Sequence, residues 1–317
     1  MEIAITGASG FIGRHLVQRF LERTGTSGPL PTLRALHSGA RPSATWTFPE
    51  ALVRTAPLYD DRGRMHPGAL NGVNTLVHLG WSTVPATAEQ DPQADQRTNV
   101  EGGLRLLDAV RSAGVRRVIF VSSGGTVYGP TDQWPIREDA PTRPTTAYGI
   151  SKLLFESYLG LAARQHGFEH IILRPGNVYG DPAPRQRPQG VIEHWLARIA
   201  EGRPIELWNP RSVTRDLLHV DDMVSAILAA VGCTERHAVL NIGTGLGTSL
   251  GELLTLLERA VGRPIATEVR STAEAAIPVN VLDPRRAMEV LGFHASVPLA
   301  TGVERLWHQI NGASRTN

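Results

Sequence analysis

Hydrophobic residues in the first half of the chain form short continuous runs that alternate with longer amphipathic stretches. The short runs are typical of buried strands and cover residues 2–6, 32–37, 75–79, 117–121 and 169–173. The longer stretches predict helices over residues 11–21, 92–113 and 146–165. Strands that alternate with helices indicate a doubly wound parallel sheet, so we predict an α/β fold.

The alternation weakens after Arg174-Pro175-Gly176. Residues 181–190 hold three prolines, two arginines and two glutamines, which is typical of an exposed loop. Ser249-Leu-Gly-Glu252 predicts a capping box in front of a further helix. We therefore expect a large domain over residues 1–175, with a contribution from about 216–245, and a smaller lobe formed by residues 176–215 and 246–317.

Composition and charge exclude several classes of protein. The chain has 317 residues, of which 41% are hydrophobic and 20% charged, as in a globular protein with a buried core. Its net charge of +2 is spread out without a dense basic run, so we expect no nucleic-acid partner. The single cysteine, Cys233, excludes an internal disulfide, and we expect no metal site. No apolar run reaches 18 residues and no apolar leader precedes the first strand, so we expect a cytoplasmic protein without a membrane span.

A glycine-rich turn follows the first predicted strand. Gly7, Gly10 and Gly13 have the spacing G-x-x-G-x-x-G, which lets the backbone turn tightly and approach a pyrophosphate at a helix N-terminus. An ordinary strand–helix turn could use the same glycines, but their place directly after the first strand favours a dinucleotide-binding Rossmann domain. The candidate cofactor-binding residues here are Gly7, Ser9, Gly10, Phe11, Ile12 and Gly13.

The end of the second predicted strand bears on the choice between NAD and NADP. A carboxylate there would hold the ribose 2′-hydroxyl of NAD, and this segment contains none. His37, Ser38 and Arg41 would instead suit a 2′-phosphate, which favours NADP(H) as the NAD(P) cofactor. The alternative is that Arg34 and Arg41 are solvated cations in an arginine-rich chain. Candidate adenine contacts are Asp60 and Asp61.

Only one of the 32 Lys and Arg residues is a lysine, Lys152, and it follows Tyr148 by four positions. Residues at i and i+4 share a helix face, so an ammonium is expected beside a phenol. A tyrosine titrates near pH 10, and lowering its pKa by about three units takes about 4 kcal/mol. An ammonium within about 4–6 Å together with an oxidised nicotinamide can supply that shift. We therefore predict that Tyr148 is a general base poised near neutral pH.

Hydroxyl side chains follow the strand over 117–121, in Ser122-Ser-Gly-Gly-Thr126-Val-Tyr-Gly129. A hydroxyl of this turn would hydrogen-bond the substrate oxygen on which Tyr148 acts. A Gly/Ser loop without chemistry is the alternative, and the position of the turn just before the Tyr148 helix favours the chemical role.

Together these motifs resemble the extended short-chain dehydrogenase/reductases, in the NAD(P)-dependent nucleotide-sugar epimerase/dehydratase group that includes UDP-glucose 4-epimerase. The resemblance covers essentially the whole chain. The matching segments are Gly7–Gly13, His78–Gly80, Asn99, Ser122–Gly129, Tyr148 with Lys152, Leu173–Gly180 and Arg215–Asp222.

The resemblance implies a role for each motif. Tyr148 would be the catalytic acid/base, and Lys152 would lower its pKa and contact the nicotinamide ribose. Asn177 would touch the sugar or its diphosphate, and Arg215 would bind the diphosphate of a nucleotide-diphosphate sugar. An ion pair with one of the following aspartates is the alternative for Arg215. The cofactor site would also include Leu79, Gly80 and Asn99.

Two positions depart from the family's pattern. The active-site hydroxyl is expected at Gly124, so we predict that Ser123 replaces it in catalysis and substrate binding, with Thr126 as the substitute. A second diphosphate-binding arginine is expected shortly before Pro278, and Arg270 is the nearest, although the spacing is long. Dehydratases of the family carry an Asp-Glu pair after the hydroxyl, where this chain has two glycines, so a dehydratase is disfavoured.

The resemblance implies a nucleotide-sugar 4-epimerase that works through a transient 4-keto sugar. The small residues Pro175-Gly176 would leave room in the sugar site, where such a sugar could rotate. An NADPH-dependent 4-keto-sugar reductase would use the same residues. A non-catalytic dinucleotide sensor is a third alternative, which the Tyr148–Lys152 pair argues against. Helix pairing across a two-fold axis, usual in the family, implies a homodimer through Leu153, Leu154, Ser157 and Leu161.

Overall fold

The computed structural model describes residues 1–22, 32–37, 53–59, 64–66, 68–182, 190–208, 210–270 and 277–314. The chain divides into two compact units. The first unit contains Met1–Val127, Thr142–Arg174 and Ile227–Leu240. The second unit contains Tyr128–Pro141, Pro175–Ala226 and Asn241–Asn317.

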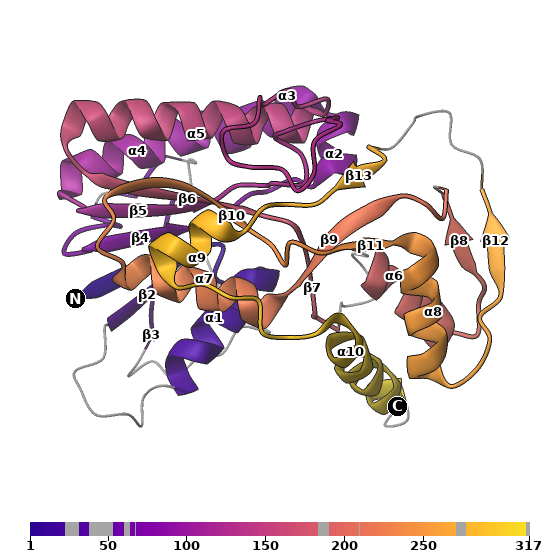
Figure 1. The fold of residues 1–317 in the computed structure, drawn as a ribbon. Helices are drawn as coiled ribbons and strands as arrows, with labels where there is room; N and C mark the ends of the chain where they lie inside the picture. The colour runs from indigo at the N-terminus through magenta and orange to yellow at the C-terminus, as the bar shows by residue number, and fades with distance from the viewer. Residues whose placement is uncertain are drawn as a thin grey trace. The chain divides into compact units, whose positions relative to one another are not determined.

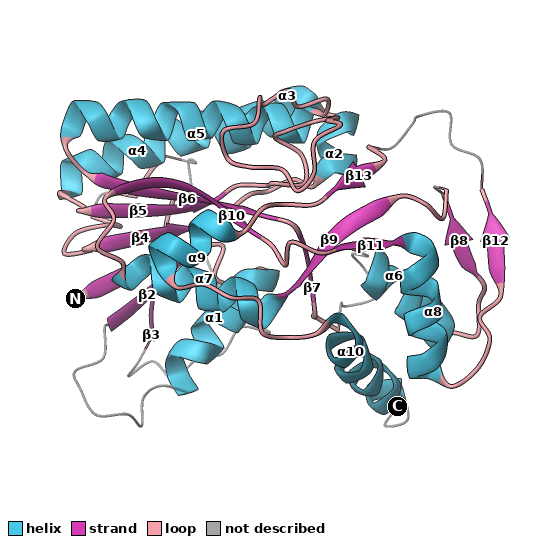
Figure 2. Cartoon of the chain, in the orientation of Figure 1, coloured by secondary structure: helices cyan, strands magenta, loops and turns pink. Residues whose placement is uncertain are grey.

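The first unit is built on a seven-stranded sheet with the order β10-β6-β5-β4-β1-β2-β3 (Figures 1 and 2). Its strands are β1 (Glu2–Thr6), β2 (Thr32–His37), β3 (Val53–Pro57), β4 (Thr75–His78), β5 (Arg117–Val121), β6 (Glu169–Pro175) and β10 (His237–Ile242). The strand pairs from β6 across to β3 are parallel. This order reverses direction between β1 and β4, as in a Rossmann sheet, so the predicted doubly wound α/β fold is confirmed.

Helices cover both faces of this sheet, which is why its central strands are buried and mostly apolar (Figure 1). They are α1 (Phe11–Glu22), α2 (Pro85–Gln90), α3 (Pro92–Asp95), the π-helix η2 (Gln96–Glu101), α4 (Gly102–Ala113), α5 (Ala147–His166) and part of α7 (Val220–Gly232). Helices α4 and α5 lie on one face, and α1 lies on the other. Phe120, Phe155 and Leu159 belong to the core cluster beneath α5 and are fully buried or nearly so.

The predicted strands over 2–6, 32–37 and 117–121 have the bounds that the sequence pattern indicates. The predicted helix over 92–113 is helical throughout, but it is divided into α3, η2 and α4. A π-helix is a local widening of the helical turn and is often found at functional sites. Here it carries Asn99, whose buried side chain bonds the carboxylate of Asp95 at 2.8 Å.

In its described residues, the second unit combines a four-stranded and a two-stranded sheet with four helices and the first part of α7. The strands are β7 (Asn177–Tyr179), β8 (Ile205–Leu207), β9 (Thr214–His219), β11 (Gly247–Ser249), β12 (Thr267–Val269) and β13 (Val279–Asn280). The helices are α6 (Val191–Ala200), α8 (Leu250–Val261), α9 (Arg285–Leu291) and α10 (Leu299–Ser314). The capping box before α8 is confirmed, since Ser249 and Glu252 each accept a backbone N–H of the other. Trp195, Leu253 and Leu306 belong to the core that α6, α8 and α10 share.

The division into units differs in two places from the expected domain boundary. Tyr128–Pro141, expected in the large domain, belongs to the second unit. Of the expected contribution from about 216–245, Ile227–Leu240 belongs to the first unit. Among the described residues, none of the helices combines the length and the apolar character needed to cross a bilayer.

Candidate active site

The glycine-rich turn joins β1 to α1, and backbone rather than side chains lines it. Gly7 has φ +68°, and its carbonyl accepts the N–H of Gly10 at 2.9 Å. A Cβ on Gly7 would lie 2.8 Å from Cα of Gly80, which follows β4. A Cβ on Gly13 would lie 2.6 Å from Cα of Ala8, so the helix can approach the turn only because residue 13 is glycine. This bare backbone at a helix N-terminus, located where the strand order reverses, fits the pyrophosphate of a dinucleotide.

The other residues expected at the cofactor fall into three groups. Ser9 is exposed, and Phe11 and Ile12 are half-buried at the start of α1. Leu79 and Gly80 follow β4, and the N–H of Gly80 donates to Thr6 Oγ1 at 3.0 Å. His37 ends β2, while Ser38, Arg41, Asp60 and Asp61 lie outside the described residues.

The alternative interpretation of β2, in which Arg34 is a solvated cation, is wrong for this residue. Its guanidinium pairs with Glu2 Oε1 at 2.7 Å and donates to the carbonyls of Ala69 and Asn71 at 2.8 and 3.0 Å. This arginine therefore ties β2 to β1 and to the turn before β4, and it has a structural role.

Tyr148 and Lys152 lie in the first two turns of α5, one turn apart. Thr146 caps the helix by accepting the N–H of Gly149 at 3.1 Å, which fixes where the helix begins. Tyr148 is half-buried and Lys152 is buried, with 4% of its surface exposed. The Lys152 ammonium donates to the carbonyl of Val121 at 2.9 Å and lies 5.6 Å from the centre of the Tyr148 ring. The structure thus brings the phenol and the ammonium together at the end of β5.

Burial works against the charged form of both groups. It raises the pKa of Tyr148 above the ordinary value, and the carboxylate of Asp95 raises it further. Burial lowers the pKa of Lys152 to about 7, although the nearby carboxylates of Glu156 and Asp95 raise it. The ammonium alone therefore does not make the phenol acidic, and further positive charge, such as that of an oxidised nicotinamide ring, is needed.

The hydroxyl-bearing turn lies directly between β5 and the start of α5. The carbonyl of Ser123 accepts the N–H groups of Thr126 and Val127 at 3.3 and 3.1 Å, which closes the turn. A Cβ on Gly149 would lie 2.9 Å from the carbonyl oxygen of Thr126, so this turn packs against the residue next to Tyr148. Thr126 Oγ1 is buried and has no hydrogen-bond partner among the described residues. An unsatisfied buried hydroxyl needs an explanation, and a ligand oxygen would provide one. Both residues are half-buried, but Thr126, the substitute of the predicted pair, has the stronger structural argument, because its hydroxyl oxygen is the buried one without a described partner.

Asn99, expected to contact the cofactor, has its amide engaged within the protein. Its Oδ1 accepts the N–H and the hydroxyl of Ser82 at 2.9 and 3.0 Å, and its Nδ2 donates to Thr83 and Asp95 at 2.9 and 2.8 Å. Asp95 is fully buried and also accepts the hydroxyl of Ser151, which adjoins Lys152. This network fastens the segment after β4 to α5. Sequence reasoning missed Asp95, although its position four residues before Asn99 on one helix face was the available signal.

Asn177 and Arg215, the expected diphosphate contacts, lie on neighbouring strands of the second unit. Asn177 pairs with Leu217, which shares a face of β9 with Arg215 because side chains alternate along a strand. The Arg215 guanidinium donates to the carbonyls of Thr214 and Ile277, both at 2.8 Å. Both of these partners are uncharged carbonyls, and within the described ranges no carboxylate pairs with this half-buried guanidinium.

The aspartates that could have formed an ion pair with Arg215 contact other groups. Asp216 accepts N–H groups of Thr244 and Gly245 at 2.9 and 3.2 Å, and Asp222 accepts that of Ser296 at 2.9 Å. Asp221 lies 3.5 Å from the ring of His219. The ion-pair interpretation of Arg215 therefore finds no support in these contacts.

Arg270, expected as a second diphosphate ligand, already pairs with two carboxylates. It lies 2.8 Å from Glu268 and 3.4 Å from Glu206 on the two-stranded sheet β12-β8. Two nearby negative charges neutralise its guanidinium, which makes it a poor ligand for an anion.

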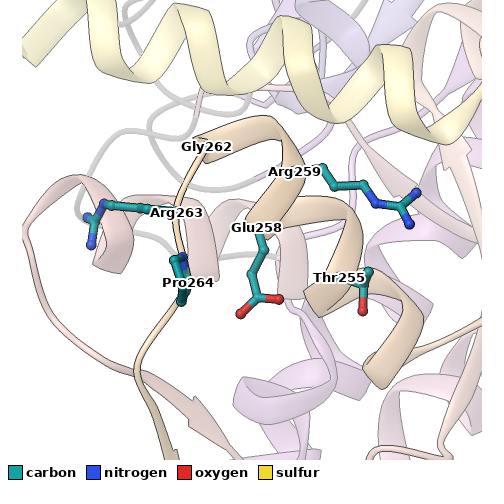
Figure 3. A pocket seen from close by; sticks show the side chains of 6 residues that line it. All are labelled: Thr255, Glu258, Arg259, Gly262, Arg263 and Pro264. Carbon is teal, nitrogen blue, oxygen red and sulfur yellow. The ribbon is translucent and has the colours of Figure 1, made fainter.

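A separate hollow of about 430 Å³ lies at the C-terminal end of α8 in the second unit (Figure 3). It is lined by Thr255, Glu258, Arg259, Gly262, Arg263 and Pro264. The carboxylate of Glu258, which accepts the N–H of Ile265 at 3.1 Å, lies between Thr255 and Pro264 in this view. None of the residues discussed above lines this hollow, so it is not part of the candidate active site.

The parallel sheet, the glycine-rich turn and the Tyr-Lys pair define a Rossmann-type enzyme that acts with a dinucleotide. The model of the "NAD dependent epimerase/dehydratase family" matches residues 3–243. The chain belongs to this family.

Comparison with individual proteins gives the same family. The chain is 36% identical to a UDP-glucose 4-epimerase of Mycolicibacterium smegmatis, over 96% of this chain and 97% of that protein. It is 27% identical to a dTDP-4-dehydro-6-deoxyglucose reductase of Escherichia coli, over 96% of each chain. The crystal structure of the Thermus thermophilus UDP-glucose 4-epimerase in complex with NAD is 28% identical, with a TM-score of 0.84 over 99% of this chain and 100% of that one.

Proposed function

We propose that this protein is a nucleotide-sugar 4-epimerase that uses a bound nicotinamide dinucleotide. The observation that carries the proposal is the Tyr148–Lys152 pair at the start of α5, beside a turn in which the buried hydroxyl of Thr126 has no partner among the residues that the structure describes. The UDP-glucose 4-epimerase of Mycolicibacterium smegmatis, similar over nearly the whole chain, supports the same reaction.

Tyr148 would act on the C4 hydroxyl of the sugar. The phenolate accepts the hydroxyl proton, and the phenol returns it once the sugar has presented its other face. When bound, the nicotinamide ring supplies the acceptor, and then the donor, of a hydride at C4. Lys152 places a positive charge beside the phenol, and the hydroxyl of Thr126 or Ser123 orients the C4 oxygen.

The second unit would hold the nucleotide diphosphate. In the part of the chain that the structure describes, the guanidinium of Arg215 has no carboxylate partner, and such a fork binds phosphate oxygens in a bidentate manner. Asn177, exposed on the same face of the sheet, would add an amide donor. We do not assign Arg270 to this role, because Glu206 and Glu268 already neutralise it.

The identity of the dinucleotide and the reaction can be tested together. The purified protein is denatured and the released dinucleotide is identified by chromatography, while UDP-glucose and UDP-galactose are offered without added cofactor. Interconversion of the two sugars with co-purified NAD or NADP supports the epimerase. An intact protein that binds dinucleotide but converts neither this pair nor other nucleotide-sugar 4-epimers contradicts it.

A nucleotide-4-keto-sugar reductase that uses NADPH is the second candidate. Two observations favour it: the similarity to the Escherichia coli dTDP-4-dehydro-6-deoxyglucose reductase, and a β2 strand that ends at His37 rather than at a carboxylate. Purified protein without dinucleotide that consumes NADPH only when a nucleotide-linked 4-keto sugar is added would establish this reaction instead.

We also propose that the protein forms a homodimer through α5. Exposed apolar side chains recur along one face of this helix, with exposed fractions of 53% for Ile150, 38% for Leu154, 36% for Tyr158 and 42% for Leu161. Of the face predicted from the sequence, Leu154, Ser157 and Leu161 are exposed and Leu153 is half-buried. Light scattering of wild type and of Leu154→Asp/Leu161→Asp tests this, since the double variant should be a monomer and the wild type a dimer.

A further inference from the structure

The Lys152 ammonium lies against the face of an aromatic ring, that of Trp81. Its Nζ lies 4.0 Å from the centre of the Trp81 ring, 4.9 Å from that of Phe120 and 5.6 Å from that of Tyr148. A cation within about 6 Å of a ring centre is attracted by the negative face of the ring, most strongly for tryptophan. Three rings therefore surround one buried ammonium.

The carboxylates beside this ammonium are committed to other partners. Glu156 binds the guanidinium of Arg174 through three hydrogen bonds of 2.6–3.2 Å. Asp95 accepts from Thr83, Asn99 and Ser151. Val121 O is the hydrogen-bond acceptor of Lys152 among the described residues. A buried charge with one carbonyl acceptor depends on its remaining neighbours, and Trp81 is the nearest ring.

Trp81 is itself held in a defined position. It follows the His78–Gly80 segment at the end of β4, and its ring centre lies 5.7 and 6.0 Å from those of Phe120 and Phe155. The next residue, Ser82, is bound through its N–H and its hydroxyl by Asn99 Oδ1. The polar network around Asn99 thus fixes the chain directly after Trp81, and the aromatic cluster fixes the ring.

We propose that Trp81 is a positioning residue, whose ring face holds the Lys152 ammonium in its charged form between the Val121 carbonyl and the Tyr148 ring. Its importance for turnover rests on the proposed function of Tyr148 and Lys152. The location and charge of the ammonium do not depend on turnover, so the two proposals can fail separately.

The single lysine makes this proposal directly measurable. Lysine labelled with ¹³C and ¹⁵N gives one side-chain signal, that of Lys152, in NMR spectra of the intact protein. The ε-CH₂ protons of the wild type should be shifted upfield by the Trp81 ring current. That shift should be reduced in Trp81→Leu to what the rings of Phe120 and Tyr148 supply, and should be reduced less in Trp81→Phe. If the ε-CH₂ protons of the wild type show no upfield shift, the proposal is overturned without any variant.

The pH titration of the same signal tests the charge. Phe and Leu are similar in size, but only Phe has a ring face, so the comparison isolates the cation–π attraction. Trp81→Leu should lower the titration midpoint of Lys152 by about one pH unit, and Trp81→Phe should lower it by less. Trp208→Leu, which removes an exposed tryptophan from the second unit, should leave the midpoint unchanged.

Turnover provides the second readout. The alkaline limb of the kcat/KM profile should move to lower pH in Trp81→Leu, because the ammonium is lost earlier, and should move less in Trp81→Phe. Equal shifts in the two variants, or a Lys152 titration that neither changes, would show that Trp81 only fills space. If Trp81→Leu shifts the NMR titration of Lys152 as expected but the wild type has no nucleotide-sugar activity, the proposed function is refuted and the placement of Lys152 stands.

Discussion

Replacing Lys152 by methionine should stabilise the fold near neutral pH, although it removes a residue of the candidate active site. Methionine keeps a linear apolar side chain of similar length and lacks the ammonium. The position is 4% exposed, so the charge of the wild type is held almost entirely out of water. The variant therefore separates the free energy of burying this charge from the packing of the aliphatic part of the side chain.

The structure gives the magnitude and its pH dependence. Burial lowers the pKa of Lys152 from 10.5 to about 7, and a shift of that size corresponds to at most about 5 kcal/mol of unfolding free energy. Loss of the hydrogen bond to Val121 offsets about 1 kcal/mol of the gain in the variant. Between pH 7 and 10.5 the unfolded chain keeps the lysine proton and the folded chain does not, so wild-type stability rises with pH through this window. The advantage of Lys152→Met should be a few kcal/mol below pH 7 and should vanish above about pH 10.5.

Urea unfolding of both proteins at pH 6, 8 and 10 measures this difference directly. Arg111→Met is a suitable control, because it removes an exposed cation from the last turn of α4. Its difference from wild type should stay small and nearly constant with pH. If Lys152→Met were less stable than wild type at pH 6, or if its difference from wild type did not change with pH, the argument from charge burial would be wrong.

Four further variants test the site and its surroundings. Lys152→Arg should lower kcat/KM by about 100-fold or more, because a planar fork cannot replace an ammonium between the Val121 carbonyl and the Trp81 ring, and wild-type turnover would contradict this. Tyr148→Phe should keep dinucleotide binding, measured by fluorescence titration, and lose about 10²- to 10⁴-fold in kcat. Asp95→Asn should move both limbs of the kcat/KM profile to lower pH, since this carboxylate raises the pKa of Tyr148 and of Lys152; unmoved limbs would show that it does not. Burial raises the pKa of Glu193 to about 7, so the gain in melting temperature of Glu193→Gln over wild type should grow between pH 4.5 and 7, and a gain that fell with pH would refute the shift.

Local sequence patterns were sufficient for the α/β fold and for the positions of several elements. The strands over 2–6 and 117–121 could be read from short apolar runs because both sides of the sheet are covered, so the middle of each strand is continuously apolar. The capping box of α8 was readable because its hydrogen bonds join residues only three positions apart. The division of the long helix around Asn99 was not readable, because the π-helix has no distinct apolar period.

Sequence spacing placed Tyr148 and Lys152 on one helix face, but it did not give their surroundings. The partners of Asn99 and the pairing of Arg270 with Glu206 join different segments of the chain. Arg34 shows the same limit, since its partner Glu2 is on a neighbouring strand. No local pattern encodes such contacts, because they depend on which strands become neighbours.

The sequence by itself determined that this chain forms a doubly wound sheet with a glycine-rich turn and a phenol one helical turn from its only ammonium. These features depend on backbone geometry and on periods of two and of nearly four residues, which act over short distances. Only the tertiary structure decided the charge state that burial favours for Tyr148 and Lys152, and only it placed the Trp81 ring and the Asp95 carboxylate beside them. The physical reason is that desolvation and electrostatic attraction depend on everything within several ångströms, and most of those neighbours come from distant parts of the chain.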